Sequence, residues 1–145
     1  MDKYGIQFAI MPIDNEALKA SPVPSGGAVL PVFAVPSAPN VRVEVIGVGV
    51  GYMGVIPVDG TDALTGTLNF WDASAAAATA LATAVNLKST NASLVLKNAW
   101  TFWTGNQSMD AGDTLSMPLT ITTPDTAADG GFFVVAYRIK EWNGE

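Results

Sequence analysis

The strongest constraint on the fold is an unbroken alternation of apolar and polar residues between Thr114 and Thr122. A period of two is that of a β-strand with one buried face and one solvated face. The apolar positions are Leu115, Met117, Leu119 and Ile121. Pro118 has no N–H to donate to a neighbouring strand, so it predicts that this strand lies at a sheet edge or carries a bulge.

Several other segments are typical of strands. Residues 132–142 are apolar on both faces in their first half, which predicts a central strand. Residues 41–51 and 64–71 also alternate, and Asp59-Gly60 between them is a strong turn signal. We therefore expect a hairpin that joins 41–55 to 64–71. Residues 1–11 alternate more weakly and predict a short strand at an edge.

One alanine-rich segment favours a different local structure. Asp72 is a good helix N-cap and is followed by alanines, which have the highest helix propensity. Because this segment has almost no apolar face, packing would stabilise a helix here only weakly. We expect a short helical turn within residues 73–80, followed by a strand over 79–87.

The glycines of the 41–54 segment do not form a phosphate-binding loop. Gly47, Gly49 and Gly51 lie inside a β-branched run, whereas a phosphate loop connects a strand to a helix. No Gly-Lys-Ser/Thr sequence follows them. These glycines instead predict bulges, or close packing of a large neighbour against bare backbone.

The first forty residues differ in character from the rest. Residues 12–40 hold six of the nine prolines together with recurrent apolar residues, a pattern that predicts an extended apolar arm. We thus divide the chain into an arm over 1–40, with a short strand, and a β-sandwich domain over 41–145. The arm either packs along its own domain or contacts a neighbouring subunit. For the second alternative the expected contact residues are Pro22, Val23, Pro24, Leu30, Val32, Phe33 and Val35.

The composition narrows the range of functions. The chain has no histidine and no cysteine, so Ser-His-Asp triads and histidine or thiolate metal sites are excluded. A net charge of −6 and seven scattered basic residues argue against nucleic-acid binding. No apolar run approaches the roughly 20 residues of a membrane helix, and no signal peptide is visible. We expect a non-enzymatic protein, made in a cytoplasm, with no catalytic residue, cofactor, metal or membrane contact.

Aromatic residues are concentrated around position 100. The set consists of Trp71, Trp100, Phe102 and Trp103. Aromatic side chains of this kind can stack on sugar rings, which makes a carbohydrate-binding β-sandwich module an alternative function. They also dominate cores and subunit contacts, so a packing role is equally compatible with the sequence.

Some local motifs resemble those of small β-sandwich proteins among the structural proteins of tailed bacteriophages. The motifs are the turn from Val58 to Thr65, the Asp72-Ala73-Ser74-Ala75 segment, the Ala111 to Leu115 turn and strand, and the final strand with Tyr137-Arg138-Ile139. Together they cover roughly residues 41–142. The resemblance implies an all-β fold, an antiparallel β-sandwich of jelly-roll type with at most one short helix.

The same resemblance implies a role in a virion. Such proteins decorate the capsid exterior as homotrimers, bind the major capsid protein and stabilise the shell. An extended N-terminal arm often takes part. A head-fibre or tail-associated module is the alternative within the same group. Likeness of fold alone does not establish function, so these implications stay expectations.

Overall fold

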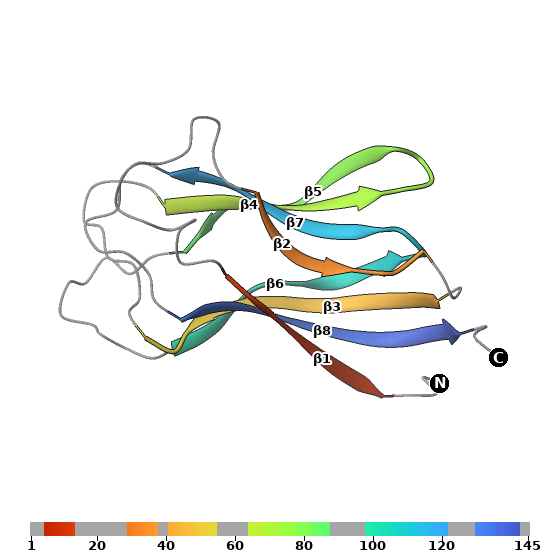
Figure 1. Cartoon of the computed structure of the whole chain (residues 1–145), viewed down its shortest axis with the longest axis horizontal. Helices are drawn as coiled ribbons and strands as arrows, with labels where there is room; N and C mark the ends of the chain where they lie inside the picture. The colour runs from red at the N-terminus through yellow and green to blue at the C-terminus, as the bar shows by residue number, and fades with distance from the viewer. Residues whose placement is uncertain are drawn as a thin grey trace.

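The computed structural model describes residues 5–13, 29–37, 41–54, 64–87, 98–121 and 130–142. They form two four-stranded antiparallel sheets that face each other as a β-sandwich (Figure 1). Sheet 1 has the order β1-β8-β3-β6 and sheet 2 the order β2-β7-β4-β5. The strands are β1 (Ile6–Pro12), β2 (Val29–Ala34), β3 (Val41–Tyr52), β4 (Leu64–Asp72), β5 (Ala77–Asn86), β6 (Asn98–Met109), β7 (Thr114–Ile121) and β8 (Gly131–Trp142).

The described residues contain no helix, so the expectation of an all-β antiparallel sandwich is confirmed. A helix able to cross a membrane is accordingly absent from this part of the chain. The strands pair in a nested order: β1 with β8, β2 with β7, β3 with β6, and β4 with β5. Two further pairings, of β3 with β8 and of β4 with β7, complete the two sheets.

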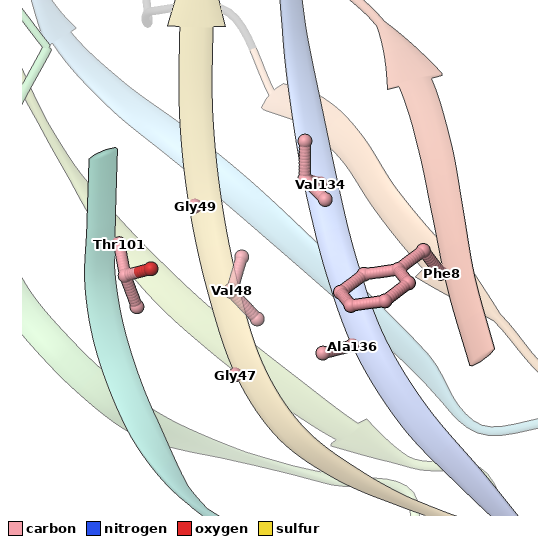
Figure 2. A pocket seen from close by; sticks show the side chains of 7 residues that line it. All are labelled: Phe8, Gly47, Val48, Gly49, Thr101, Val134 and Ala136. Atoms are coloured by element: carbon pink, nitrogen blue, oxygen red, sulfur yellow. The ribbon is translucent and has the colours of Figure 1, made fainter. Parts of the chain in front are cut away.

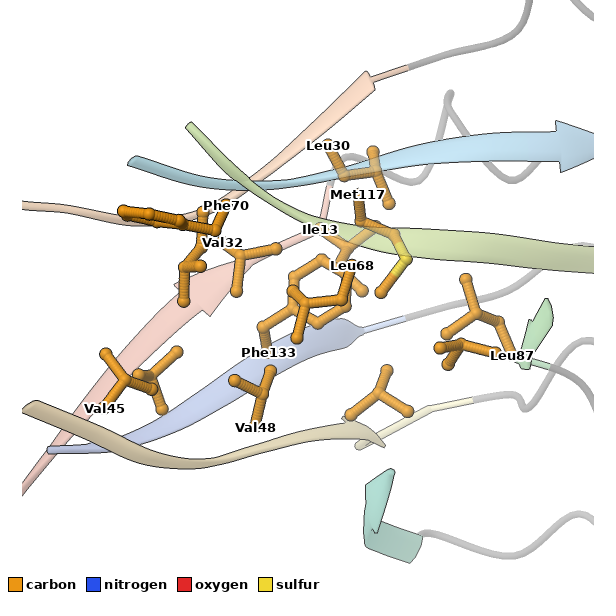
Figure 3. Packing of buried hydrophobic residues seen from close by; sticks show 14 of the residues in the cluster. Ile13, Leu30, Val32, Val45, Val48, Leu68, Phe70, Leu87, Met117 and Phe133 are labelled. Atoms are coloured by element: carbon orange, nitrogen blue, oxygen red, sulfur yellow. The ribbon is translucent and has the colours of Figure 1, made fainter. Parts of the chain in front are cut away.

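The core lies between the sheets (Figure 3). Alternate residues of β7 point into it, because Leu115, Met117 and Leu119 are buried while Ser116 between the first two is only half-buried. Sheet 1 contributes Val48, Phe133 and Val135 to the opposite wall. The alternation that predicted the strand thus also identified its buried face.

A bulge in β3 keeps its valines on one face. Val43 and Val45 are buried, and so are Val48 and Val50, although the spacing changes by one residue between the two pairs. The register with β8 shifts between Val45 and Gly47, where β3 advances two residues and β8 only one, and this absorbs the extra residue of β3. Strand β6 has an extra residue of its own opposite the same point. The glycine-rich sequence of this strand therefore does mark a bulge, as expected.

Strand β7 is an interior strand, because β2 lies on one side of it and β4 on the other. The expected edge position of Pro118 is therefore wrong. The β4–β7 ladder instead contains the pairs Gly66↔Leu119 and Asn69↔Ser116 with no pair between them. The register is the same on both sides of this gap. A proline without an N–H is accommodated at this local gap.

The expected hairpin of 41–55 with 64–71 does not form. Strand β3 belongs to sheet 1 and β4 to sheet 2, so the chain crosses between the sheets after β3. The Asp59-Gly60 turn signal lies outside the described residues. A turn signal indicates that the chain reverses, but it does not specify that the next strand pairs with the previous one.

The alanine-rich segment forms a tight turn and then β5, with no helix. The Asp72 carboxylate accepts hydrogen bonds from the backbone amides of Ser74 and Ala75 at 2.9 and 3.0 Å. The hydrogen bond from the Ala75 amide, followed by that from the Ser74 hydroxyl, lowers the pKa of Asp72 below its ordinary value. Asp72 thus caps a turn, because the following residues extend and pair with β4.

Asp113 joins the two sheets at one end of the sandwich. Its buried carboxylate accepts hydrogen bonds from the amide of Ala73, which follows β4, and from the amide of Asp110, which follows β6. The backbone carbonyl of Asp113 also accepts a hydrogen bond from the amide of Val35, just after β2. One side chain and its backbone therefore connect the ends of strands from both sheets.

Both described parts of the expected arm are strands of the sandwich. Strand β1 lies at the edge of sheet 1 and β2 at the edge of sheet 2. The predicted edge position of the first strand is therefore confirmed. The described parts of the 1–40 segment, residues 5–13 and 29–37, thus supply one strand to each sheet.

Candidate functional site

The first strand turns its largest apolar side chains to solvent. Ile6, Phe8 and Ile10 have exposed fractions of 52%, 69% and 66%. Ala9 and Met11, which alternate with them, pack against the core opposite Val135 and Phe133 of β8. Because the core already covers the inner face of β1, these three side chains project from the outer face of sheet 1.

The neighbouring strands continue this apolar outer face. Three rows of paired residues cross β1, β8 and β3, and the face continues to β6 in two of them. The rows are Phe8, Ala136, Gly47, Thr104; Ile10, Val134, Gly49, Thr101; and Pro12, Phe132, Gly51. None of these residues is charged. We refer to these three rows together with Ile6 as the apolar face.

A furrow runs along β3 within the apolar face. Gly47 and Gly49 have no side chains, so Phe8 and Val134 on one side and Thr101 on the other enclose a hollow of about 210 Å³ (Figure 2). Figure 2 shows the Phe8 ring lying over Ala136 beside this hollow. Apolar groups of a binding partner can enter it without displacing a side chain.

A second hollow of about 300 Å³ lies farther along the same face, where β8 begins and β1 ends. It is lined by Ile10, Pro12, Ile13, Met53, Gly130, Gly131 and Phe132. Met53 at its margin is 66% exposed. The exposed apolar surface therefore extends from the furrow to this end of the sandwich.

Charged groups occur at the other end of the apolar face. Ile6 pairs with Arg138, and Arg138 pairs across β8 and β3 with Glu44. The Arg138 Nη1 and Glu44 Oε1 atoms are 3.9 Å apart, an ion pair that is partly exposed. Within the described ranges no group of three or more carboxylate, histidine or cysteine side chains is arranged to hold a metal. The chemistry available on this face is apolar contact with a polar margin.

The residues expected to form an arm contact are placed differently. Leu30, Val32 and Val35 are buried in the core of this chain, with exposed fractions of 4%, 1% and 3%. Phe33 is half-buried, and its ring lies 5.1 Å from that of Tyr137. Pro22, Val23 and Pro24 lie outside the described residues. The apolar character of residues 30–35 is therefore explained by strand β2, which closes one edge of the core.

The expected aromatic cluster is distributed over both sheets. Trp71 belongs to β4 in sheet 2 and is 41% exposed, whereas Phe102 and Trp103 belong to β6 in sheet 1 and pack against the core. The Phe102 ring meets the Phe133 ring edge-on at 6.4 Å. The side chain of Trp100 is outside the described part. Among the side chains that are described, those of Trp71, Phe102 and Trp103, no contact supports a sugar platform, and carbohydrate binding stays a prediction.

Sequence reasoning did not single out the apolar face. Both alternating sets of β1 are largely apolar, so periodicity alone does not reveal which set faces solvent. Size is misleading here, because large apolar residues such as Ile6, Phe8 and Ile10 are ordinarily expected on the buried face. The pairing of Ala9 with the buried Val135 decides the orientation.

Comparison with known proteins adds no relative to this picture: neither the family models nor the curated proteins nor the solved structures contain a match to this chain.

Proposed function

We propose that this chain is a non-enzymatic structural protein that works through protein–protein contact at the apolar face. The observation that carries the proposal is the outward orientation of Ile6, Phe8 and Ile10, each more than half exposed. Contiguous exposed apolar surface of this kind marks contact sites in soluble proteins. The assembly that we propose is a virion, in which the chain decorates the capsid exterior and binds the major capsid protein.

The energetics support a binding role for this face. Fully burying an Ile or Phe side chain stabilises by about 1.5–3 kcal/mol, so covering the exposed part of each contributes roughly 1–2 kcal/mol. Leaving these side chains in water forgoes that energy in the isolated chain. A partner that covers all three recovers several kcal/mol before the costs of association are subtracted.

The strand connections support the jelly-roll type of sandwich that the resemblance implies. Eight strands pair in nested order, from β1 with β8 inward to β4 with β5. Jelly rolls are eight-stranded, two-sheet proteins, and many capsid domains belong to this class. Because one fold serves many functions, the apolar face carries the functional argument and the fold only agrees with it.

Co-sedimentation with shells tests the proposal. Shells assembled from the major capsid protein of the same genome are mixed with the full chain and pelleted. Deletion of residues 1–40 is unsuitable as a test, because it removes β1 and β2 from the two sheets. Point variants that keep every strand are therefore needed.

Phe8→Asp and Ile10→Asp place a charge on the apolar face at positions that the fold leaves exposed. Thr79→Asp adds the same charge at an exposed position on β5 of sheet 2 and is the control. We expect the unaltered chain and the Thr79 variant to pellet with shells at raised salt, and the two β1 variants to stay in the supernatant. An unaltered chain that never pellets with shells overturns the virion role. Phe8 and Ile10 variants that pellet fully overturn the role of the face.

A further inference from the structure

The apolar face carries a ridge and a furrow in the same register. Phe8 lies in one row with Gly47, and Ile10 lies in one row with Gly49, with a residue of β8 between them in each case. The large side chains of β1 form the ridge and the glycines of β3 form the furrow. Adjacent strands are about 4.8 Å apart, so the backbones of β1 and β3 are separated by roughly 10 Å, and the Phe8 ring leans across β8 to the border of the furrow (Figure 2).

This arrangement is complementary to itself. The two-fold axis lies in the plane between the two copies and runs parallel to β8. Rotation by 180° about it places β1 of one copy over β3 of the other and keeps every row at the same height along the strands. The ridge of one copy then lies over the furrow of the other, and the reverse holds at the same time. An isologous contact requires this property, in which one patch meets an identical patch.

We propose that two copies of this chain pair face to face through sheet 1, with Phe8 of each copy seated in the Gly47–Gly49 furrow of the other. The inference rests on the proposed function of the apolar face as a protein-contact surface. A second copy occupies that face in the free chain, and the capsid protein replaces it on the shell. A partner of unrelated sequence has no need of a ridge that matches the furrow of the same molecule, row by row.

The furrow has room for the ring that the proposal places there. The hollow above Gly47 and Gly49 measures about 210 Å³. An apolar cavity of about 150 Å³ is large enough to bind benzene. The neighbouring rows contribute no charge, so no unpaired ionic group is buried when the two faces meet. The Arg138–Glu44 pair lies at the end of the face, where contacts are normally polar and wet.

The size of the face predicts the strength of the pairing. With the axis on β8, the partner covers β1, β8 and β3 but not β6, which extends beyond the partner's β1. Three strands span about 14 Å, and seven residues of β1 span about 23 Å, which gives a footprint on the order of 330 Å² per copy. A pair therefore buries on the order of 700 Å², less than a stable specific interface, and the contact is a weak and transient one. We expect a reversible dimer with a dissociation constant on the order of hundreds of micromolar.

Sedimentation velocity of the full chain across the micromolar range is the first measurement. We expect a monomer–dimer equilibrium that Phe8→Asp shifts to monomer. Gly47→Leu should do the same by filling the furrow, since a Cβ at Gly47 meets no heavy atom closer than 3.7 Å and the hollow lies above it. The double variant Phe8→Ala/Gly47→Leu should regain dimer, because the new side chain occupies the space that the partner's Phe8 vacates. Circular dichroism verifies that each variant is folded.

Cross-linking through introduced cysteines identifies the residues that meet, since the chain has no cysteine of its own. Facing sheets pack about 10 Å apart, beyond the roughly 7 Å limit between the Cα atoms of a disulfide, so a bismaleimide linker that spans the gap is used in place of oxidation. A mixture of Phe8→Cys and Gly47→Cys chains should give a covalent dimer, while each variant alone should give at least tenfold less. Thr79→Cys on sheet 2 is the control for random collision.

The outcomes separate this inference from the proposed function. A monomer at all concentrations, a trimer, or a covalent dimer of Phe8→Cys with itself overturns the two-fold pairing. A monomer that still pellets with shells leaves the virion role standing and refutes the pairing alone. Cross-linking through positions 8 and 47, together with an unaltered chain that does not pellet with shells even when diluted until it is monomeric, supports the pairing and refutes the virion role.

Discussion

The Tyr52 hydroxyl donates a 2.8 Å hydrogen bond to the backbone carbonyl of Leu87. Tyr52 ends β3 in sheet 1, and Leu87 directly follows β5 in sheet 2, so the bond connects the two sheets. Both residues are almost completely buried, with exposed fractions of 1% and 0%. Water therefore cannot replace the hydroxyl as donor to this carbonyl.

Tyr52→Phe should lower the free energy of unfolding by about 1–3 kcal/mol, because it leaves the Leu87 carbonyl buried without this donor. Urea denaturation at neutral pH measures the difference. Tyr137→Phe is the control, since the Tyr137 ring is only half-buried against Phe33. Equal stability of the Tyr52 variant and the unaltered chain contradicts the prediction.

The stability of the chain should also fall at alkaline pH. Burial raises the pKa of Tyr52 above its ordinary value near 10, so the folded state keeps a proton that the unfolded state loses. The resulting stabilisation is fully present below about pH 10. Above that pH it decreases by up to about 1.4 kcal/mol per pH unit, until the folded phenol itself ionises.

Urea unfolding of the unaltered chain and of Tyr52→Phe between about pH 8 and 11 checks this dependence. The free energy of unfolding of the unaltered chain minus that of Tyr52→Phe should be constant up to about pH 10 and decrease above it. A difference that stays constant to pH 11 would show that the phenol does not titrate differently in the two states.

Asp113→Ala should destabilise the fold by about 2–5 kcal/mol. The variant removes the acceptor of two amides, those of Ala73 and Asp110, in a nearly buried position. Asp110→Ala is the comparison, because it breaks only the exposed Asp110–Arg42 ion pair, with its oxygen–nitrogen distance of 2.8 Å. Exposed pairs contribute at most about 1 kcal/mol. In thermal and urea unfolding the Asp113 variant should be clearly less stable than the Asp110 variant. The reverse order would show that the Asp113 carboxylate does not stabilise the fold through these two amides.

Gly66→Ala should cost about 1–3 kcal/mol through overpacking. A Cβ at this position lies 2.5 Å from the Met117 sulfur and 3.2 Å from a Leu119 methyl group, and Met117 is fully buried. Gly47→Ala is the matched control, since its Cβ meets only ordinary contacts at 3.7 Å or more. Chemical denaturation of the two variants measures the contrast. Equal stabilities would mean that Met117 moves aside freely.

The strands themselves were predictable from local pattern, whereas their partners were not. Alternation identified residues 114–122 and 132–142, which closely match β7 and β8. The same reasoning joined residues 41–55 to 64–71, although these strands belong to different sheets. Pairing depends on where the chain crosses the sandwich, and no local property of the two strands encodes that crossing.

The position of Pro118 and the role of residues 30–35 illustrate a second limit. Proline statistics favoured an edge for Pro118, but a gap in one ladder is sufficient to accommodate it inside the sheet. Prolines around residues 30–35 suggested an arm, but Leu30 and Val32 alternate inward as ordinary strand residues do. Propensity describes the average environment of a residue type, and tertiary packing decides the individual case.

The candidate site depends on the register of distant strands. That β1 is an edge strand follows from its sequence, whereas the match of Phe8 with the level of Gly47 exists only after β8 has paired with both β1 and β3. The glycines alone suggested bulges, and the bulge at Gly47 is present. The furrow beside Phe8 is a property of three strands together.

The nested pairing also determines when the fold can form during synthesis. β1 pairs with β8 alone among the described strands, and β8 also connects β1 to β3. The ribosome makes β8 after all the others, so β1 has no sheet to join until then. Closing such distant contacts is slow because the loop entropy is lost first. The inward side chains of β1, Ala9 and Met11, therefore stay uncovered on the growing chain until β8 has been made.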